Sequence, residues 1–150
     1  MQSFYKNGVK FSCTQCHACC RGEPGVVLLS SSDIKNLCAF LDLTTDSFIK
    51  KYTRPIFHAG RPLISLIEKS NNDCIFWNAG CTVYTVRPLQ CSTYPFWNRL
   101  MTDEHAWQRE RQNCPGIDHG TTHSPDFIRE QLQRREEEPY AFWDDYKEVE

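Results

Sequence analysis

The stretch CTQCHACC, residues 13–20, is the densest cysteine cluster of the chain and is expected to decide its fold. Three of its thiols recur at intervals of three residues, a spacing that lets one loop wind around a metal centre and direct several sulfur atoms at it. Thiolate sulfur is soft and negatively charged, so it selects iron or zinc over magnesium or calcium. The stretch therefore predicts a metal-binding loop.

Later cysteines supply the remaining ligands of this hypothesis. In bacterial ferredoxins a remote cysteine followed by proline complements a run of this spacing, and Cys114-Pro115 offers such a partner. Adjacent side chains in an extended segment point to opposite faces, so Cys19 and Cys20 are expected to serve different sites. We predict two four-thiolate sets, the first of Cys13, Cys16, Cys19 and Cys114 and the second of Cys20, Cys74, Cys81 and Cys91. One larger cluster or bridging sulfurs would use the same residues differently.

The choice of metal rests on spacing and on compartment. No signal-peptide pattern opens the sequence, so we expect a reducing cytoplasm, where dense cysteines indicate metal before disulfides. Zinc sites with four cysteines usually combine paired CxxC units, and only the first cluster has that spacing, which favours iron–sulfur. Zinc, at about two ions, stays the alternative. The ninth cysteine, Cys38, falls on an apolar helix face and is expected in the core, and His17 is expected to be a bystander.

Composition narrows the classes of function. The chain has 150 residues, enough for a single domain over 1–150, and its net charge of −2 gives no basic footprint for nucleic acid or an anionic membrane. Its longest apolar runs, 26–29 and 38–41, are far shorter than the roughly 18 residues of a membrane span. The GxGxxG, GxxxxGK[ST], GxSxG and HExxH patterns do not occur in it.

The pattern of apolar residues predicts a small α+β domain with short strands and a few helices around a cysteine-lined metal centre, and with much irregular structure. Residues 34–41 carry apolar side chains at i, i+3, i+4 and i+7 behind a capping segment, which predicts an inward-packing helix. The other expected elements are strands at 9–11, 26–29, 63–67 and near 106–109, a hairpin of 74–77 and 81–84, helices at 45–52 and 124–137, and an aromatic, acidic tail.

Several motifs together resemble a known family. They are CxxCxxCC, Cys74-Ile75-Phe76-Trp77, Gly80-Cys81-x2-Tyr84, Arg87-Pro88-x2-Cys91, Tyr94-Pro95-Phe96 and Cys114-Pro115-Gly116-Ile117. Over about residues 13–120 the chain resembles the YkgJ cysteine-cluster family, the zinc- or iron-chelating CxxCxxCC domain. The resemblance implies that the eight cysteines form the metal site. The family's named activity is that of flagellin lysine N-methylase, so the resemblance implies a cofactor more directly than a reaction.

The resulting hypothesis is an iron–sulfur or zinc protein, acting as a redox or iron–sulfur-dependent enzyme component with an unidentified protein or small-molecule partner. A zinc-stapled interaction module is the alternative. A protein-lysine N-methylase-like enzyme rests on the resemblance alone. Arg87 is expected either to hydrogen-bond cluster sulfurs or an anionic substrate, or to form a structural salt bridge.

Overall fold

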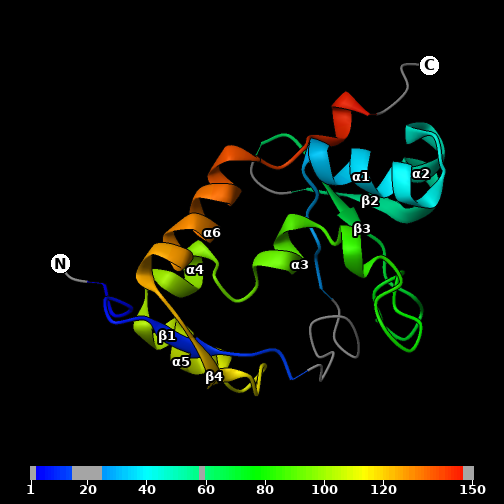
Figure 1. Cartoon of the computed structure of the whole chain (residues 1–150). Coiled ribbons are helices and arrows are strands. Elements are labelled where there is room, and N and C mark those ends of the chain that lie inside the picture. Colours follow the sequence, from blue (N-terminus) through cyan, green and yellow to red (C-terminus); the bar gives the residue numbers. More distant parts are fainter. Residues whose placement is uncertain (1–2, 15–24, 58–59, 147–150) are drawn as a thin grey trace. The chain divides into compact units, whose positions relative to one another are not determined.

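The fold is that of a computed structural model, which describes residues 3–14, 25–57 and 60–146 (Figure 1). The chain divides into two compact units, each built from two separate segments. Unit 1 comprises Met1–Cys19 and Thr93–Glu137, and unit 2 comprises Cys20–Ser92 and Glu138–Glu150. Helices and two small antiparallel sheets make up these units, so the predicted α+β class is confirmed. The expectation of one domain over 1–150 stays a prediction.

A two-stranded sheet joins the two segments of unit 1. Strand β1 (Val9–Phe11) pairs antiparallel with β4 (Ile117–His123), placing Val9 opposite His123 and Phe11 opposite Ile117. The register shifts after Lys10, because β4 has more residues than β1 between the Val9–His123 pair and the Phe11–Ile117 pair. The shift is a bulge that lets the chain beyond Phe11 turn along the start of β4.

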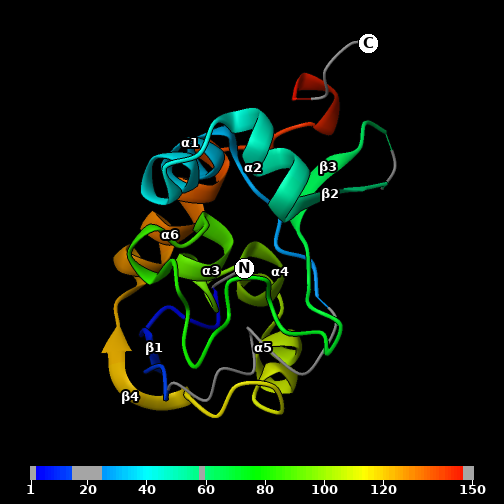
Figure 2. The same ribbon diagram turned by 90° about the vertical axis from the view of Figure 1, so that its right-hand side faces the viewer.

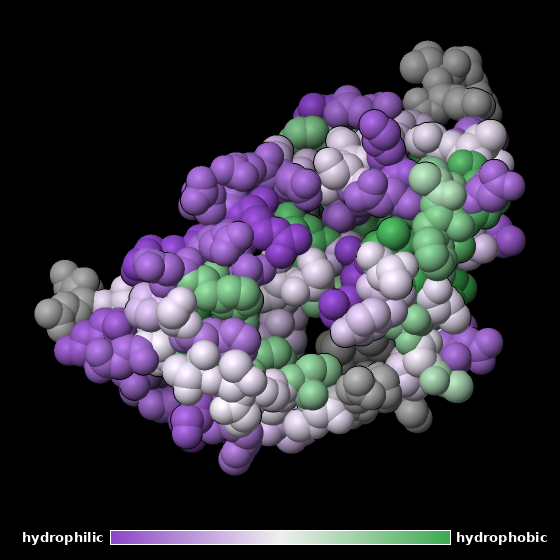
Figure 3. Space-filling model, viewed as in Figure 1, coloured by the Kyte–Doolittle hydropathy of each residue, from purple (hydrophilic) through white to green (hydrophobic). Residues whose placement is uncertain are grey.

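Three helices pack around this sheet in unit 1: α4 (Asn98–Met101), α5 (Glu104–Glu110) and α6 (Pro125–Glu137). The Ser124 hydroxyl accepts the N–H of Phe127 at 3.1 Å, which confirms the expected Ser-Pro start of α6. The exposed face of α6 is hydrophilic (Figure 3). The buried side chains are mostly aromatic or aliphatic: Tyr5, Phe96, Leu100, Met101, Trp107, Cys114, Ile117 and Ile128.

Unit 2 begins its regular structure with two helices and a hairpin. Helix α1 (Ser31–Leu41) is followed by α2 (Thr45–Tyr52), which runs directly into β2 (Thr53–Ile56), and β3 (Leu63–Leu66) returns antiparallel to β2 (Figure 2). The Ser30 side chain and the carboxylate of Asp33 form a capping box at the start of α1. Both helices therefore match their sequence predictions.

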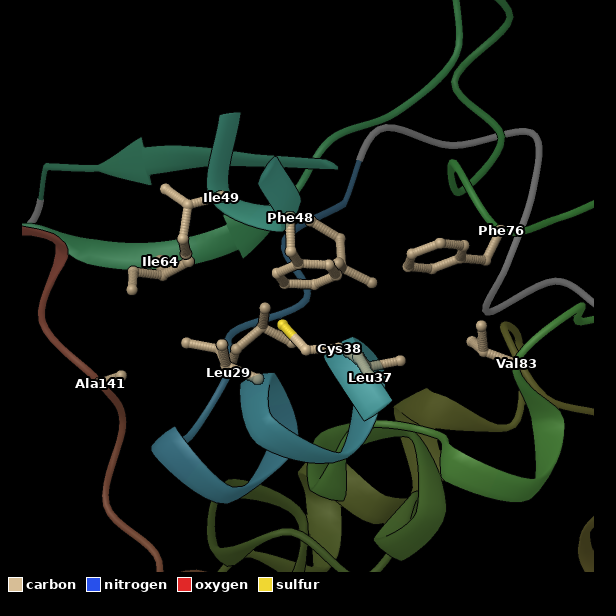
Figure 4. Close-up of a cluster of buried hydrophobic side chains, with 11 residues drawn as sticks. Leu29, Leu37, Cys38, Phe48, Ile49, Ile64, Phe76, Val83 and Ala141 are labelled. Atoms are coloured by element: carbon tan, nitrogen blue, oxygen red, sulfur yellow. The ribbon is translucent and has the colours of Figure 1, made fainter. Parts of the chain in front are cut away.

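The core of unit 2 lies between these helices and the hairpin. Phe48 of α2 is fully buried and lies at its centre, with Ile64 of β3 and Leu37 of α1 also buried (Figure 4). Cys38 is 8% exposed and directs its sulfur toward Phe48, which confirms its predicted place in the core. The apolar stripe of α1 thus packs as its periodicity predicts.

The C-terminal tail completes unit 2. The N–H of Ala141 donates to the carbonyl of Leu29 at 2.9 Å, and the N–H of Trp143 donates to that of Pro62 at 2.8 Å. Trp143 begins a short 3₁₀ helix, Trp143–Asp145, and Ala141 is buried. The described part of the tail therefore docks on the rest of unit 2.

One of the predicted strands is wrong and another is incomplete. The expected strand near 106–109 lies within helix α5, because the Asp103 side chain accepts the N–H of His105 at 2.9 Å and caps a helix there. The expected strand at 26–29 is extended but pairs with β3 through one isolated bridge, Leu28 to Ser65. Side chains replace further ladder bonds, since the Ser65 hydroxyl accepts the N–H of Val27 at 3.0 Å.

The segment 74–84 is only partly the predicted hairpin. One isolated bridge, Trp77 to Cys81, flanks the turn at Asn78–Gly80, where Ala79 has a φ of 54°. The chain then enters a 3₁₀ helix, Tyr84–Val86, instead of a second strand. Strand β4 was not predicted, because its sequence IDHGTTH has no apolar alternation. No helix in the described part of the chain is long and apolar enough to cross a membrane.

Candidate metal centre

The predicted ligands are distributed over both units. Cys16, Cys19 and Cys20, like the bystander His17, lie outside the described residues. In unit 1, Cys13 is exposed and Cys114 is buried. In unit 2, the remaining predicted ligands are half-buried: Cys74, Cys81 and Cys91. The structure therefore presents five of the eight candidate thiols for inspection.

The segment before Cys13 lies against the loop after Cys114. Beyond the Phe11–Ile117 pair, the N–H of Ser12 donates to the carbonyl of Gly116 at 3.3 Å. The approach is close enough that a Cβ on Gly116 would lie 2.1 Å from the Ser12 carbonyl oxygen. Only glycine fits here without movement of the backbone. Antiparallel pairing at this point brings the two chain segments that carry Cys13 and Cys114 side by side.

A second contact secures the same segment. The Ser12 hydroxyl accepts the N–H of Thr121 at 2.9 Å, inside the bulged part of β4. Gly120 has a φ of +79°, and a Cβ there would lie 2.1 Å from the Ser12 hydroxyl oxygen. The contacts with Gly116 and Thr121 fix the position of Ser12. They therefore also restrict the position of the next residue, Cys13.

Cys114 lies among aromatic side chains of unit 1 and beside two polar groups. Its backbone N–H donates to the carbonyl of Glu110 at 2.9 Å, and the Tyr94 hydroxyl donates to Glu110 Oε1 at 2.7 Å. Burial raises the pKa of Tyr94 far above its ordinary value, and Glu110 and Cys114 raise it further. Tyr94 is therefore a neutral hydroxyl beside the Cys114 thiol.

In unit 2 a short loop connects Cys74 with Cys81. The N–H of Trp77 donates to the carbonyl of Cys74 at 2.9 Å, and Trp77 forms a bridge with Cys81. The Lys69 ammonium donates to the carbonyl of Trp77. These contacts close the loop and hold both cysteines at its base.

Cys91 lies in helix α3 (Leu89–Thr93), and the residue before it, Gln90, holds this helix in place. The Gln90 amide accepts the N–H of Leu28 at 3.0 Å and donates to the carbonyl of Val26 at 2.7 Å. Val26 lies six positions after Cys20 in the sequence. Gln90 therefore ties the helix of Cys91 to the chain that leaves the CxxCxxCC stretch.

The described residues bring no complete set of metal ligands together. Across 3–14, 25–57 and 60–146, no group of three or more His, Cys, Asp or Glu side chains is assembled that could hold a metal ion. A cysteine-lined centre is thus not displayed by these residues, and the ligand set stays a prediction. The donor chemistry nevertheless fits iron or zinc, because the candidate side chains are thiols of two small, partly buried groups.

In the described part of the chain Arg87 lies against Tyr84, and its two expected roles stay predictions. Its guanidinium stacks on the ring of Tyr84, with 3.9 Å from the guanidinium carbon to the ring centroid, and its Nε donates to the Tyr84 carbonyl at 3.1 Å. Sequence reasoning missed the residues that position the cysteines, namely Ser12, Gly116, Gln90 and Lys69. The adjacency of Gly116 to Cys114-Pro115 and of Gln90 to Cys91 was the available signal.

A small α+β chain with two groups of positioned cysteines is characteristic of a cysteine-based metal-binding protein. A comparison with protein families matches residues 12–121 to the CxxCxxCC family, described as "Putative zinc- or iron-chelating domain". The chain belongs to this family, which confirms the resemblance found in the sequence and supports binding of zinc or iron. No solved structure matches the chain.

Proposed function

We propose that the chain holds iron–sulfur clusters, or zinc, in two four-cysteine centres and acts in the cytoplasm as a redox or iron–sulfur-dependent enzyme component. The first centre consists of Cys13, Cys16, Cys19 and Cys114, and the second of Cys20, Cys74, Cys81 and Cys91. Family membership supports the metal. The observation that carries the division into two centres is the contact of Ser12 with Gly116.

That contact supports the first centre because it brings together ligands a hundred residues apart in sequence. Cys13 directly follows Ser12, and Cys114 precedes Gly116 by two residues. Both belong to unit 1, whose N-terminal segment extends to Cys19. A set built on Cys13 and Cys114 therefore needs no ligand from the other unit.

The second centre is supported by the contents of unit 2. This unit includes the described candidate ligands Cys74, Cys81 and Cys91. The Cys74–Cys81 loop and the tie from Gln90 to Val26 each hold candidate ligands within that unit.

A bound metal would act on the fold and on the chemistry of the protein. An iron–sulfur cluster supplies single-electron transfer when bound, whereas zinc supplies a structural cross-link. The chain's own residues contribute thiolates, exclude water from Cys114 and fix the loops. Because thiols must deprotonate to bind either metal, loading releases protons and is weakened at low pH.

The deciding experiment is anaerobic purification followed by elemental analysis for iron, zinc and acid-labile sulfide, with the visible spectrum. Iron with matching sulfide, and absorbance that bleaches on reduction, supports the proposal. Zinc alone, at about two ions and without colour, replaces it with the zinc-stapled module. A chain that holds neither metal would contradict both.

Single substitutions test the two centres separately. Cys114→Ser should remove the metal of the first centre and leave the second, and Cys81→Ser should do the reverse. Cys38→Ala is the matched control, because Cys38 lies in the apolar core and is no proposed ligand. Loss of all metal from either single variant would support one shared cluster instead.

The small size of the two cores favours the zinc-stapled interaction module as the second candidate. Unit 1 has helices of four to thirteen residues and a two-stranded sheet, and such small cores commonly need a metal cross-link. Pull-down with metal-loaded and metal-stripped protein would test it. A partner retained only by the zinc-loaded form would support the module.

A further inference from the structure

Tyr94 and Glu110 form a partly buried polar pair beside Cys114. The Tyr94 hydroxyl donates to Glu110 Oε1 at 2.7 Å, and only 12% of the Glu110 side chain is exposed. The proposed metal centres do not use either group as a ligand. A half-buried carboxylate and phenol against an apolar core require a reason, because burial of polar groups is costly.

Local geometry fixes both residues relative to the sulfur. Glu110 is the last residue of α5, and its carbonyl accepts the N–H of Cys114 at 2.9 Å, so the two residues belong to one helical turn. Cys114 is 8% exposed, in the same cluster of buried side chains that Tyr94 packs against. The phenol thus has the carboxylate and the thiol as its polar neighbours.

Further contacts keep the phenol in place. The rings of Tyr94 and Trp97 pack edge to face with centroids 4.9 Å apart. Arg99 lies 4.0 Å from Glu110 Oε2 and 5.3 Å from the Trp97 ring. These residues orient the phenol through its ring and through its carboxylate partner, all within unit 1.

The chemistry of the hydroxyl matches a metal-bound sulfur. The Tyr94 hydroxyl is a hydrogen-bond donor, as its contact of 2.7 Å with Glu110 Oε1 shows. A thiolate ligand is a strong hydrogen-bond acceptor, and hydrogen bonds to ligand sulfurs tune the metal. The Cys114 thiolate would compete with Glu110 for this single proton.

We propose that Tyr94, oriented by Glu110, is a positioning residue of the first metal centre that donates a hydrogen bond to the Cys114 sulfur when this sulfur is a metal-bound thiolate. The inference rests on the proposed function. The hydrogen bond withdraws charge from the sulfur and holds its orientation. It therefore affects the electronic structure of the centre without supplying a ligand.

The test uses Co²⁺ as a spectroscopic probe in the full chain, stripped of metal and titrated anaerobically. Tyr94→Phe removes only the hydroxyl. It should bind as many Co²⁺ equivalents as the unsubstituted chain, with the sulfur-to-cobalt charge-transfer band moved to lower energy and about tenfold weaker affinity at one centre. Tyr5→Phe is the matched control, since Tyr5 is a buried tyrosine of the same core, and it should leave the band unchanged.

Glu110 variants keep the test decisive if Tyr94→Phe folds poorly. Glu110→Gln retains an acceptor for the phenol and should keep the band near its original energy. Glu110→Leu removes the acceptor that competes for the phenol proton, so the hydrogen bond to the sulfur should persist and the shift of Tyr94→Phe should not be reproduced. An unchanged band and affinity in Tyr94→Phe, or a band moved to lower energy in Glu110→Leu, would overturn the inference while leaving the proposed function intact. Full cobalt binding by Cys114→Ser would instead contradict the ligand assignment, and with it this role for Tyr94.

Discussion

The carboxylate of Asp33 accepts the backbone N–H of Leu89 at 3.0 Å, across 56 positions of sequence. Its other oxygen accepts the N–H of Ser30 at 2.9 Å and closes the capping box of α1. One buried carboxylate therefore joins the start of α1 to the start of α3, two residues before Cys91.

Removal of this carboxylate should be costly. Asp33→Ala loses the cap and leaves two N–H groups without this acceptor, so we expect the free energy of unfolding to fall by about 2–4 kcal/mol. Chemical denaturation of the metal-loaded chain measures it. Asp46→Ala is the control, because Asp46 forms an exposed pair with Lys50 and should cost at most about 1 kcal/mol. Equal losses in the two variants would show that Asp33 has no special role.

Gly116 should tolerate no side chain. In Gly116→Ala the new Cβ would collide with the Ser12 carbonyl, so we expect a loss of about 1–3 kcal/mol and weaker metal binding at the first centre. Thermal unfolding and metal content provide the two readouts. Gly25→Ala is the matched control, since a Cβ at Gly25 meets nothing within 4 Å. A Gly116→Ala chain as stable and metal-rich as Gly25→Ala would refute the close approach.

Cys38 should make stability depend on alkaline pH. Burial raises the pKa of its thiol, and a hydrogen bond with Thr45 offsets part of that increase. The thiol in the unfolded chain ionises near pH 8.5, so its contribution is complete below that pH and is lost as the pH rises toward the folded pKa. Between these values the free energy of unfolding should fall by at most about 1.4 kcal/mol per pH unit.

Denaturation of the unsubstituted chain and of Cys38→Ala over pH 7–10 isolates this contribution. The other ionisable groups are common to both chains. The contribution of Cys38 is therefore the difference between the two slopes of the free energy of unfolding against pH. The slope should be smaller in the variant above pH 8.5. Parallel curves would mean that the Cys38 thiol ionises equally in both states.

The C-terminal tail should contribute to the stability of unit 2. Removal of residues 139–150 takes away the buried Ala141 and its bond to Leu29, and exposes part of the core of unit 2. Hydrogen exchange should then accelerate at the amides of Ile64 and Leu66. Arg61→Ala serves as comparison, because its ion pairs with Asp144 and Asp145 are exposed and should contribute at most about 1 kcal/mol. Exchange unaffected by the truncation would show that the tail is dispensable.

Local sequence signals were sufficient where one segment determines its own structure. The capped apolar stripe of α1, the start of α6 at Ser124-Pro125 and the buried Cys38 all followed from spacing and capping. Strand β4 could not be predicted in this way, because it forms by pairing with β1, more than a hundred residues earlier. Its polar sequence has no preference that reveals the partner.

The candidate site likewise combines a local motif, which could be predicted, with long-range contacts, which could not. The family could be recognised from the spacing of the cysteines, because such a motif is local in the sequence. The contacts that position Cys13 and Cys91 could not be recognised in this way, since Ser12 meets Gly116 and Gln90 meets Val26 only after the chain has folded back. Side chains that substitute for backbone partners, as Gln90 does, leave no periodic pattern.

The interleaving of the two units has a consequence for synthesis on the ribosome. Because β1 pairs with β4, the N-terminal strand has no partner until the codon for His123 has been translated. Unit 2 likewise awaits Ala141 before its core is covered. The nascent chain therefore carries Cys13 through most of elongation before the sheet that ends two residues earlier can form.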